Sequence, residues 1–204
     1  MVLKVVNYCR AIVIAHGKSE FMMAEYIKSN LRLNIAILGN KNGGSSVQVK
    51  GLLNYIKSDS RLKNLNAIQN RFLPQIVKKK MVGCKIFPIM DLDDCTSLEA
   101  EKYKSGEMFN SYCLNEYIVP IWCEPKFDVA MQKSNLIKTL PSDNQKVTTY
   151  SKIFPIAHSN GTNLEEIQEF RNRIKNNSHT NINVFVDYCI DIVSENLELK
   201  RKVN

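Results

Sequence analysis

Residues 82–94 read VGCKIFPIMDLDD, a mostly apolar run that ends in three carboxylates within four residues. A short apolar run of this kind is typical of a buried strand. We therefore predict a strand over 82–90. It places Asp91, Asp93 and Asp94 directly after its carboxyl end.

A second apolar run lies nearer the start of the chain, where residues 11–20 read AIVIAHGKSE. Its β-branched residues predict a buried strand over 11–15, followed by a turn at 16–18. Ser19 has the side chain of a helix N-cap. Apolar residues then recur at helical spacing, which predicts an amphipathic helix over 20–31.

The remaining elements alternate along the chain. We predict strands over 34–38 and 117–123. A helix should begin near Ser46, and a second should cover 62–80 with a break at Pro74. Further helices are predicted over 97–115, over 164–175 with Asn163 as the N-cap, and over 180–199. Alternation of this kind predicts an α/β fold with a mostly parallel sheet, helices on its faces and helices at the C-terminus. The expected organisation is a domain over 1–160 with a helical extension over 161–204 packed on it.

Two prolines conflict with this pattern, because proline is disfavoured in central strands. Pro88 and Pro120 therefore predict sheet edges or bulges. The segments KIFPIM (85–90) and KIFPIA (152–157) are nearly identical, but their flanking sequences differ and do not indicate a repeat.

The net charge of +8 is unevenly distributed. Residues 1–80 hold 14 Lys and Arg against 3 Asp and Glu, whereas the rest of the chain is slightly acidic. Such asymmetry indicates a polyanionic partner, most simply nucleic acid. The alternative is a solvated lysine face that keeps the protein soluble.

Other features predict a cytoplasmic protein. No stretch reaches the roughly 18 apolar residues of a membrane span, and residues 1–10 lack the apolar region of a signal peptide. The six cysteines include no CxxC pair, which argues against a zinc site and favours reduced thiols.

Ligands of open α/β sheets bind at the carboxyl ends of strands. Asp91 and Asp93 follow one such end, and two close carboxylates favour a divalent cation such as Mg²⁺, the arrangement used in metal-assisted phosphodiester chemistry. A solvated acidic loop, or a helix N-cap, is the alternative. Glu124 and Asp128, after the predicted 117–123 strand, are either further ligands or the start of a helix.

Phosphate binding is predicted near the first turn. Lys18, Lys41, Ser45 and Ser46 lie beside glycines whose amides suit phosphate oxygens. The 39–46 loop is not a Walker A motif, and an ordinary flexible connection is the alternative.

Taken together, IVIA-HGKSE and KIFPIM-DLDD resemble the Toprim domain of topoisomerases, primases, OLD-family nucleases and the related RloB-like and abortive-infection proteins. The family pattern is an apolar strand, a Glu-Gly turn, a helix and a later strand ending in DxD. The resemblance covers roughly residues 11–125 and assigns Asp91 and Asp93 to the metal. His16 stands at the family's glutamate, so either His16 or Glu20 would complete the site. Histidine suits Mn²⁺ better than Mg²⁺.

The resemblance implies a metal-dependent nuclease acting on DNA or RNA, with Mg²⁺ or Mn²⁺ as cofactor and His16, Glu20, Asp91 and Asp93 as its catalytic residues. It further implies a setting in phage defence or a mobile element, with a homodimer or a partner protein of a defence system as candidate assemblies. The alternative is a catalytically degenerate module that binds nucleic acid or a nucleotide, or serves as a sensor or adaptor. Convergence of the four side chains within about 5–6 Å favours the metal site.

Overall fold

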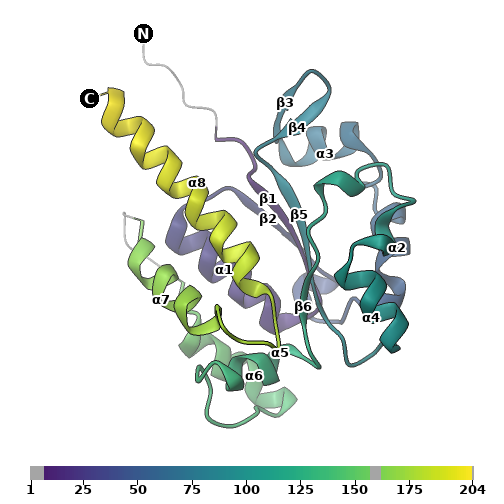
Figure 1. Ribbon diagram of the computed structural model, residues 1–204, viewed down its shortest axis with the longest axis vertical. Helices are drawn as coiled ribbons and strands as arrows, with labels where there is room; N and C mark the ends of the chain where they lie inside the picture. Colours follow the sequence, from purple (N-terminus) through teal and green to yellow (C-terminus); the bar gives the residue numbers. More distant parts are fainter. Residues whose placement is uncertain (1–6, 157–161, 204) are drawn as a thin grey trace.

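The computed structural model describes residues 7–156 and 162–203, and of Lys41 and residues 197–203 it describes the backbone only. Its centre is a parallel sheet of four strands in the order β2-β1-β5-β6 (Figure 1). The strands are β1 (Ala11–Ala15), β2 (Ile35–Leu38), β5 (Lys85–Asp91) and β6 (Ile121–Cys123). The predicted α/β class and parallel sheet are confirmed.

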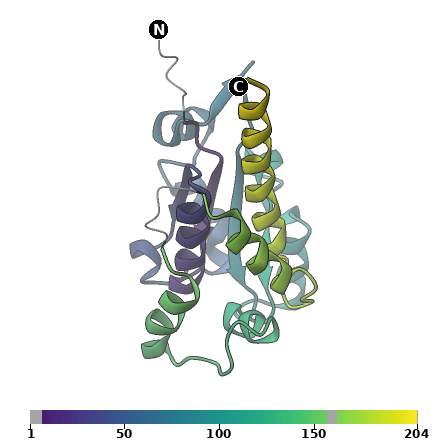
Figure 2. The ribbon, with the colours of Figure 1, turned by 90° about the vertical axis from the view of Figure 1, so that its left-hand side faces the viewer.

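Helices cover both faces of this sheet (Figures 1 and 2). One face carries α1 (Lys18–Leu31), α5 (Phe127–Lys133), α6 (Asp143–Ile153), α7 (Leu164–Ile174) and α8 (Ile182–Val203). The other carries α2 (Val49–Ser58), α3 (Leu65–Phe72) and α4 (Ser97–Lys104). Side chains alternate across a strand, so Ala11 and Val13 of β1 enter the first core, while Ile12 and Ile14 enter the second. The C-terminal helices thus share a core with the sheet.

The predicted helix over 62–80 is wrong beyond Phe72. Leu73 adopts a left-handed conformation (φ 56°) and Pro74 follows it, which ends α3. The chain then forms an antiparallel hairpin of β3 (Gln75–Val77) and β4 (Lys80–Val82). Its two-residue turn, Lys78 and Lys79, has positive φ at both positions, as the right-handed twist of a hairpin favours.

Other details of the helices also differ from the prediction. Gly17, not Ser19, is the N-cap of α1. The predicted 97–115 helix stops at Lys104, since Gly106 has a φ of 80° and short 3-10 turns follow at Glu107–Phe109 and Asn115–Tyr117. Helix α6 was not predicted.

Pro88 lies inside the sheet and not at an edge, because β5 is flanked by β1 and β6. Its pairing with Ile14 of β1 is in continuous register without a bulge, so this expectation is wrong. The main-chain oxygen of Ile89 points toward β1, where it accepts a hydrogen bond from the His16 N–H. The main-chain atoms of Pro88 therefore point to the other side, toward β6. The paired register of β5 with β6 begins only at Ile89, so the missing N–H of Pro88 breaks no hydrogen bond of that pairing. The buried Tyr103 hydroxyl fills this gap, 2.7 Å from the Pro88 carbonyl oxygen. Pro120 does precede an edge strand.

Among the described residues, no helix combines the length and apolar character needed to cross a membrane.

Candidate functional site

His16 and Asp91 lie together at the carboxyl edge of the sheet. His16 follows β1, and Asp91 is the last residue of the neighbouring strand β5, whose register with β1 aligns Ala15 with Ile89. The backbone N–H of His16 donates to the carbonyl of Ile89 at 2.9 Å, which fixes the start of the turn. His16 Nε2 is 4.0 Å from Asp91 Oδ2, and each side chain is only 13% exposed. The two residues therefore share one edge of the sheet.

Glu20 is turned back toward this edge from the first turn of α1. Its carboxylate accepts a hydrogen bond from the Gly17 N–H at 2.9 Å, and the residue is 2% exposed. Burial raises the pKa of Glu20, while the adjacent His16 opposes that shift. Glu20 is therefore a buried acid beside the imidazole, one helical turn from it.

Asp91 is held by α5. Its Oδ1 accepts a hydrogen bond from the backbone N–H of Phe127 at 2.8 Å. Burial, with the charge of Glu20 next, raises the pKa of Asp91 to about 9, although the Phe127 N–H acts in the opposite direction. The raised pKa therefore reflects burial first and the neighbouring carboxylates second.

The two following acids differ in their surroundings. Asp93 is exposed on the turn after β5, whereas Asp94 points inward. Both carboxylate oxygens of Asp94 are buried and have no hydrogen-bond partner among the described residues, as is also true of His16 Nδ1. Burial raises the pKa of Asp94, and His16 opposes the shift. Asp94 is thus the more enclosed of the pair.

Asp128 belongs to the same cluster, as a buried residue in the first turn of α5. The Tyr150 hydroxyl donates to its Oδ1 at 2.6 Å, and the Lys146 ammonium lies 3.3 Å from its Oδ2. Burial alone would lower the pKa of Lys146, but Asp128 and then Asp143 raise it above its ordinary value. Lys146 and Tyr150 carried no sequence signal, because the helix that presents them was not predicted. Asp128 was considered both as a ligand and as a helix start.

The predicted phosphate loop does pack against the first turn. The Val47 N–H donates to the His16 carbonyl at 2.8 Å. At Gly43, whose φ is 82°, an added Cβ would lie 3.0 Å from the Gly17 oxygen, so only glycine allows this approach. Ser45 and Ser46 are exposed on the loop.

Lys18 is also exposed, with its ammonium 5.3 Å from the Phe21 ring centre. The backbone at Lys41 forms a 3-10 turn, and its side chain lies outside what the structure describes.

A cation suits this edge chemically. The carboxylates of Glu20, Asp91 and Asp94 lie at this edge, and neither oxygen of Asp94 has a hydrogen-bond partner among the described residues. Asp128, beside them, already pairs with Lys146. As the side chains stand, no three His, Cys, Asp or Glu residues in the described ranges form a group able to hold a metal ion. Of the four side chains whose convergence would favour a metal site, His16 and Asp91 lie 4.0 Å apart, whereas Asp93 is exposed on the turn. A metal would have to draw further ligands inward.

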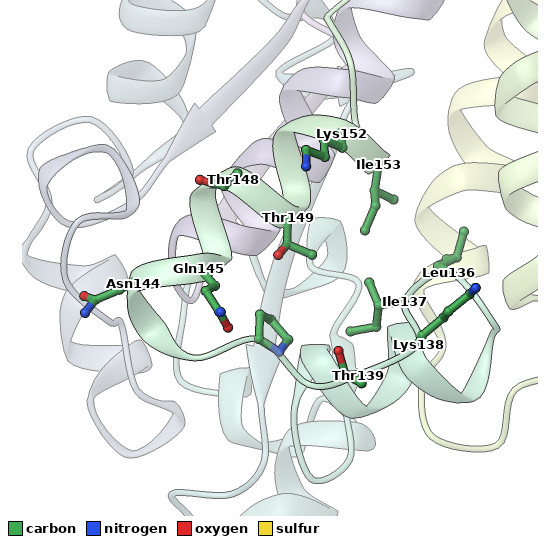
Figure 3. A pocket seen from close by; sticks show the side chains of 11 residues that line it. Leu136, Ile137, Lys138, Thr139, Asn144, Gln145, Thr148, Thr149, Lys152 and Ile153 are labelled. Atoms are coloured by element: carbon green, nitrogen blue, oxygen red, sulfur yellow. The ribbon is translucent and has the colours of Figure 1, made fainter.

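A separate hollow lies on the same side of the molecule as α6. It has a volume of about 530 Å³, between α6 and the loop before it (Figure 3). Thr149 and Ile153 of α6 face Ile137 and Thr139 across it. None of the predicted site residues lines it, so the acidic cluster and this hollow are separate features.

Comparisons with models of known protein families, with curated proteins and with solved structures give no significant match for this chain.

Proposed function

We propose that the protein is a Toprim-like, metal-dependent nuclease that hydrolyses phosphodiesters of DNA or RNA. The observation that carries the proposal is the meeting of His16 and Asp91 at the carboxyl edge of a parallel sheet, with Glu20 and Asp94 directed to the same place. A parallel sheet presents its ligands at this edge. The two motifs are far apart along the chain, and the pairing of β1 with β5 brings them together at this edge.

The side chains divide the chemistry between them. Asp91, Glu20 and Asp94 would hold Mg²⁺ or Mn²⁺, with exposed Asp93 reaching it through water. When bound, the cation would polarise the phosphoryl oxygens and lower the pKa of a bound water. His16, 4.0 Å from Asp91, is placed to accept or return a proton. Lys18 and the 39–46 loop would hold the phosphate backbone beside it.

The setting that we propose is cytoplasmic, in defence against phage or in a mobile element. All six cysteines are free thiols, as a reducing compartment favours. A homodimer or a partner protein of a defence system would complete the assembly.

The second candidate is a catalytically degenerate module that binds nucleic acid or a nucleotide. Histidine at position 16, a poorer magnesium ligand than glutamate, favours it. So does the lack of a three-ligand group in the ranges that the structure describes.

One assay separates the two. The protein is incubated with labelled single- and double-stranded DNA and RNA, with Mg²⁺ and with Mn²⁺, alongside Asp91→Asn/Asp93→Asn. The matched control is Glu101→Gln/Glu107→Gln, which removes two exposed carboxylates from another part of the surface. We expect cleavage by the wild type and the control, and its loss in the aspartate variant. Cleavage that persists in the aspartate variant would place the chemistry elsewhere, and no cleavage of any substrate would favour the binding module.

A further inference from the structure

The segment from Val49 to Met81 is strongly basic. It holds eight Lys and Arg against a single acid, Asp59. That acid is already paired, because Arg61 holds it with two nitrogens, the closer at 2.6 Å. Within this segment the other cations therefore have no acid to pair with.

Five of these cations, Lys63, Arg71 and Lys78–Lys80, are exposed on α3, the turn before it and the β3–β4 hairpin. We call them the basic face. None of them lies within 4.0 Å of a carboxylate among the described residues. Unpaired cations gathered on one surface produce a field that attracts polyanions.

The basic face is also hollowed. A surface hollow of about 500 Å³ is lined by Arg61, Lys63 and Arg71 together with Asn64, Asn66 and Asn70. Asn64 already accepts the Ala67 N–H as the cap of α3. Guanidinium and ammonium groups bind phosphate oxygens, and amide side chains both donate and accept hydrogen bonds. This mixture suits a polynucleotide backbone, because its phosphates can bind the cations and its sugars can exchange hydrogen bonds with the amides.

The hairpin lies at the opposite end of the molecule from the acidic cluster. Pro74, just before β3, pairs with Cys9, just before β1, at the amino end of the strands. Figure 1 shows the hairpin at one end and α5 and α6, which flank the acidic edge, at the other. The seven residues of β5 span this separation, about 23 Å at 3.3 Å per residue. In a duplex with 3.4 Å between base pairs, that distance is about 7 base pairs.

We propose that the basic face binds the phosphate backbone of a polynucleotide, which runs from the hairpin past α3 to the acidic edge. The proposal rests on the proposed function only for the end of the strand that reaches the acidic cluster. It makes the ligand a polymer of at least about 7 base pairs or its single-stranded equivalent, and not a mononucleotide. Exposed Leu73, Val77 and Val82 flank the cations and would suit an acidic protein instead, but the Asn-lined hollow favours nucleic acid.

The test is binding in EDTA, where no metal-dependent cleavage can occur. Fluorescence anisotropy measures Kd for labelled DNA duplexes of 6, 12 and 24 base pairs, and for single-stranded DNA and RNA of 24 nucleotides, between 50 and 200 mM salt. The variants are Lys78→Gln/Lys79→Gln/Lys80→Gln and Lys63→Gln/Arg71→Gln. The control is Lys133→Gln/Lys138→Gln/Lys175→Gln, three exposed lysines on the other face of the sheet.

For the long ligands we expect the slope of log K against log salt to fall by about 1 for each phosphate contact removed, so by about 3 in the hairpin variant and about 2 in the other. The control triple should keep the wild-type slope, and the 6-base-pair duplex, which is too short to run from the hairpin to the acidic edge, should bind more weakly than the longer duplexes. The proposal would be overturned if all proteins gave the same slope. It would also be overturned if the control triple weakened binding as much as the basic-face variants do. So would polyglutamate, or vesicles rich in phosphatidylserine, competing as well as DNA. Tight binding without any cleavage in Mg²⁺ or Mn²⁺ would sustain this inference and refute the nuclease.

Discussion

Asp91→Asn is expected to make the protein less sensitive to alkaline pH. The pKa of Asp91 is raised to about 9, first by burial and then by Glu20, against about 3.9 in an unfolded chain. A carboxyl group whose pKa is raised takes up a proton on folding between those two values. Its contribution is therefore most favourable below about pH 4 and is lost progressively as the pH rises to about 9.

The size of the effect follows from this linkage. One proton taken up on folding costs about 1.4 kcal/mol of unfolding free energy for each pH unit, hence about 4 kcal/mol between pH 5 and pH 8. That value is an upper limit, because the charge of Glu20 acts on Asp91 and the two acids titrate as an interacting pair. Asparagine keeps an oxygen for the Phe127 N–H and removes the titration. Between pH 5 and pH 8, the wild type should therefore lose about 1–4 kcal/mol more unfolding free energy than the variant.

Urea unfolding at both pH values, in EDTA, measures this difference. Glu101→Gln is the control, since it removes an exposed carboxylate on α4. Its pH dependence should match that of the wild type. The reasoning fails if Asp91→Asn and the wild type lose the same stability between pH 5 and pH 8, because the buried carboxyl would then not hold a proton.

Three further predictions concern other residues. His16→Ala should lower the cleavage rate by about 10²-fold or more if the imidazole moves a proton, and His16→Glu, tested in the same assay, should raise activity in Mg²⁺; unchanged rates in both would show that position 16 is only a turn. Tyr150→Phe leaves the buried Asp128 without its hydroxyl donor, so urea unfolding should show a loss of about 1–3 kcal/mol, and no loss would mean that Lys146 alone satisfies the acid. Tyr103→Phe should cost a similar amount, since it removes the hydroxyl that bonds the Pro88 carbonyl inside the sheet; a stability equal to the wild type would refute that role.

The sequence predicted the two motif strands and the edge where they end, because buried parallel strands are short, apolar and closed by polar turns. It did not predict α6, whose residues show little helical periodicity. The pentapeptide KIFPI shows why local sequence is insufficient. At 85–89 it lies in a central strand, whereas at 152–156 it ends α6 and leaves the helix at Phe154. Tertiary surroundings decide between these outcomes.

The site was predictable in part for the same reason. Adjacency of His16 and Asp91 follows from parallel strands, whereas the inward position of Asp94 depends on the geometry of one turn. Lys146 and Tyr150 reach Asp128 only through the packing of α6 on α5. Side chains brought together by an unpredicted helix leave no periodic signal in the chain.

We propose that the carboxyl edge of the sheet binds a divalent cation. Electron paramagnetic resonance of Mn²⁺ titrated into the protein measures this directly, since the free ion gives the signal and the bound ion loses it. We predict saturable binding to the wild type and to Glu101→Gln/Glu107→Gln, and loss of that binding in Asp91→Asn/Asp93→Asn. Equal Mn²⁺ binding by the wild type and the aspartate variant, or none by the wild type, would contradict the account.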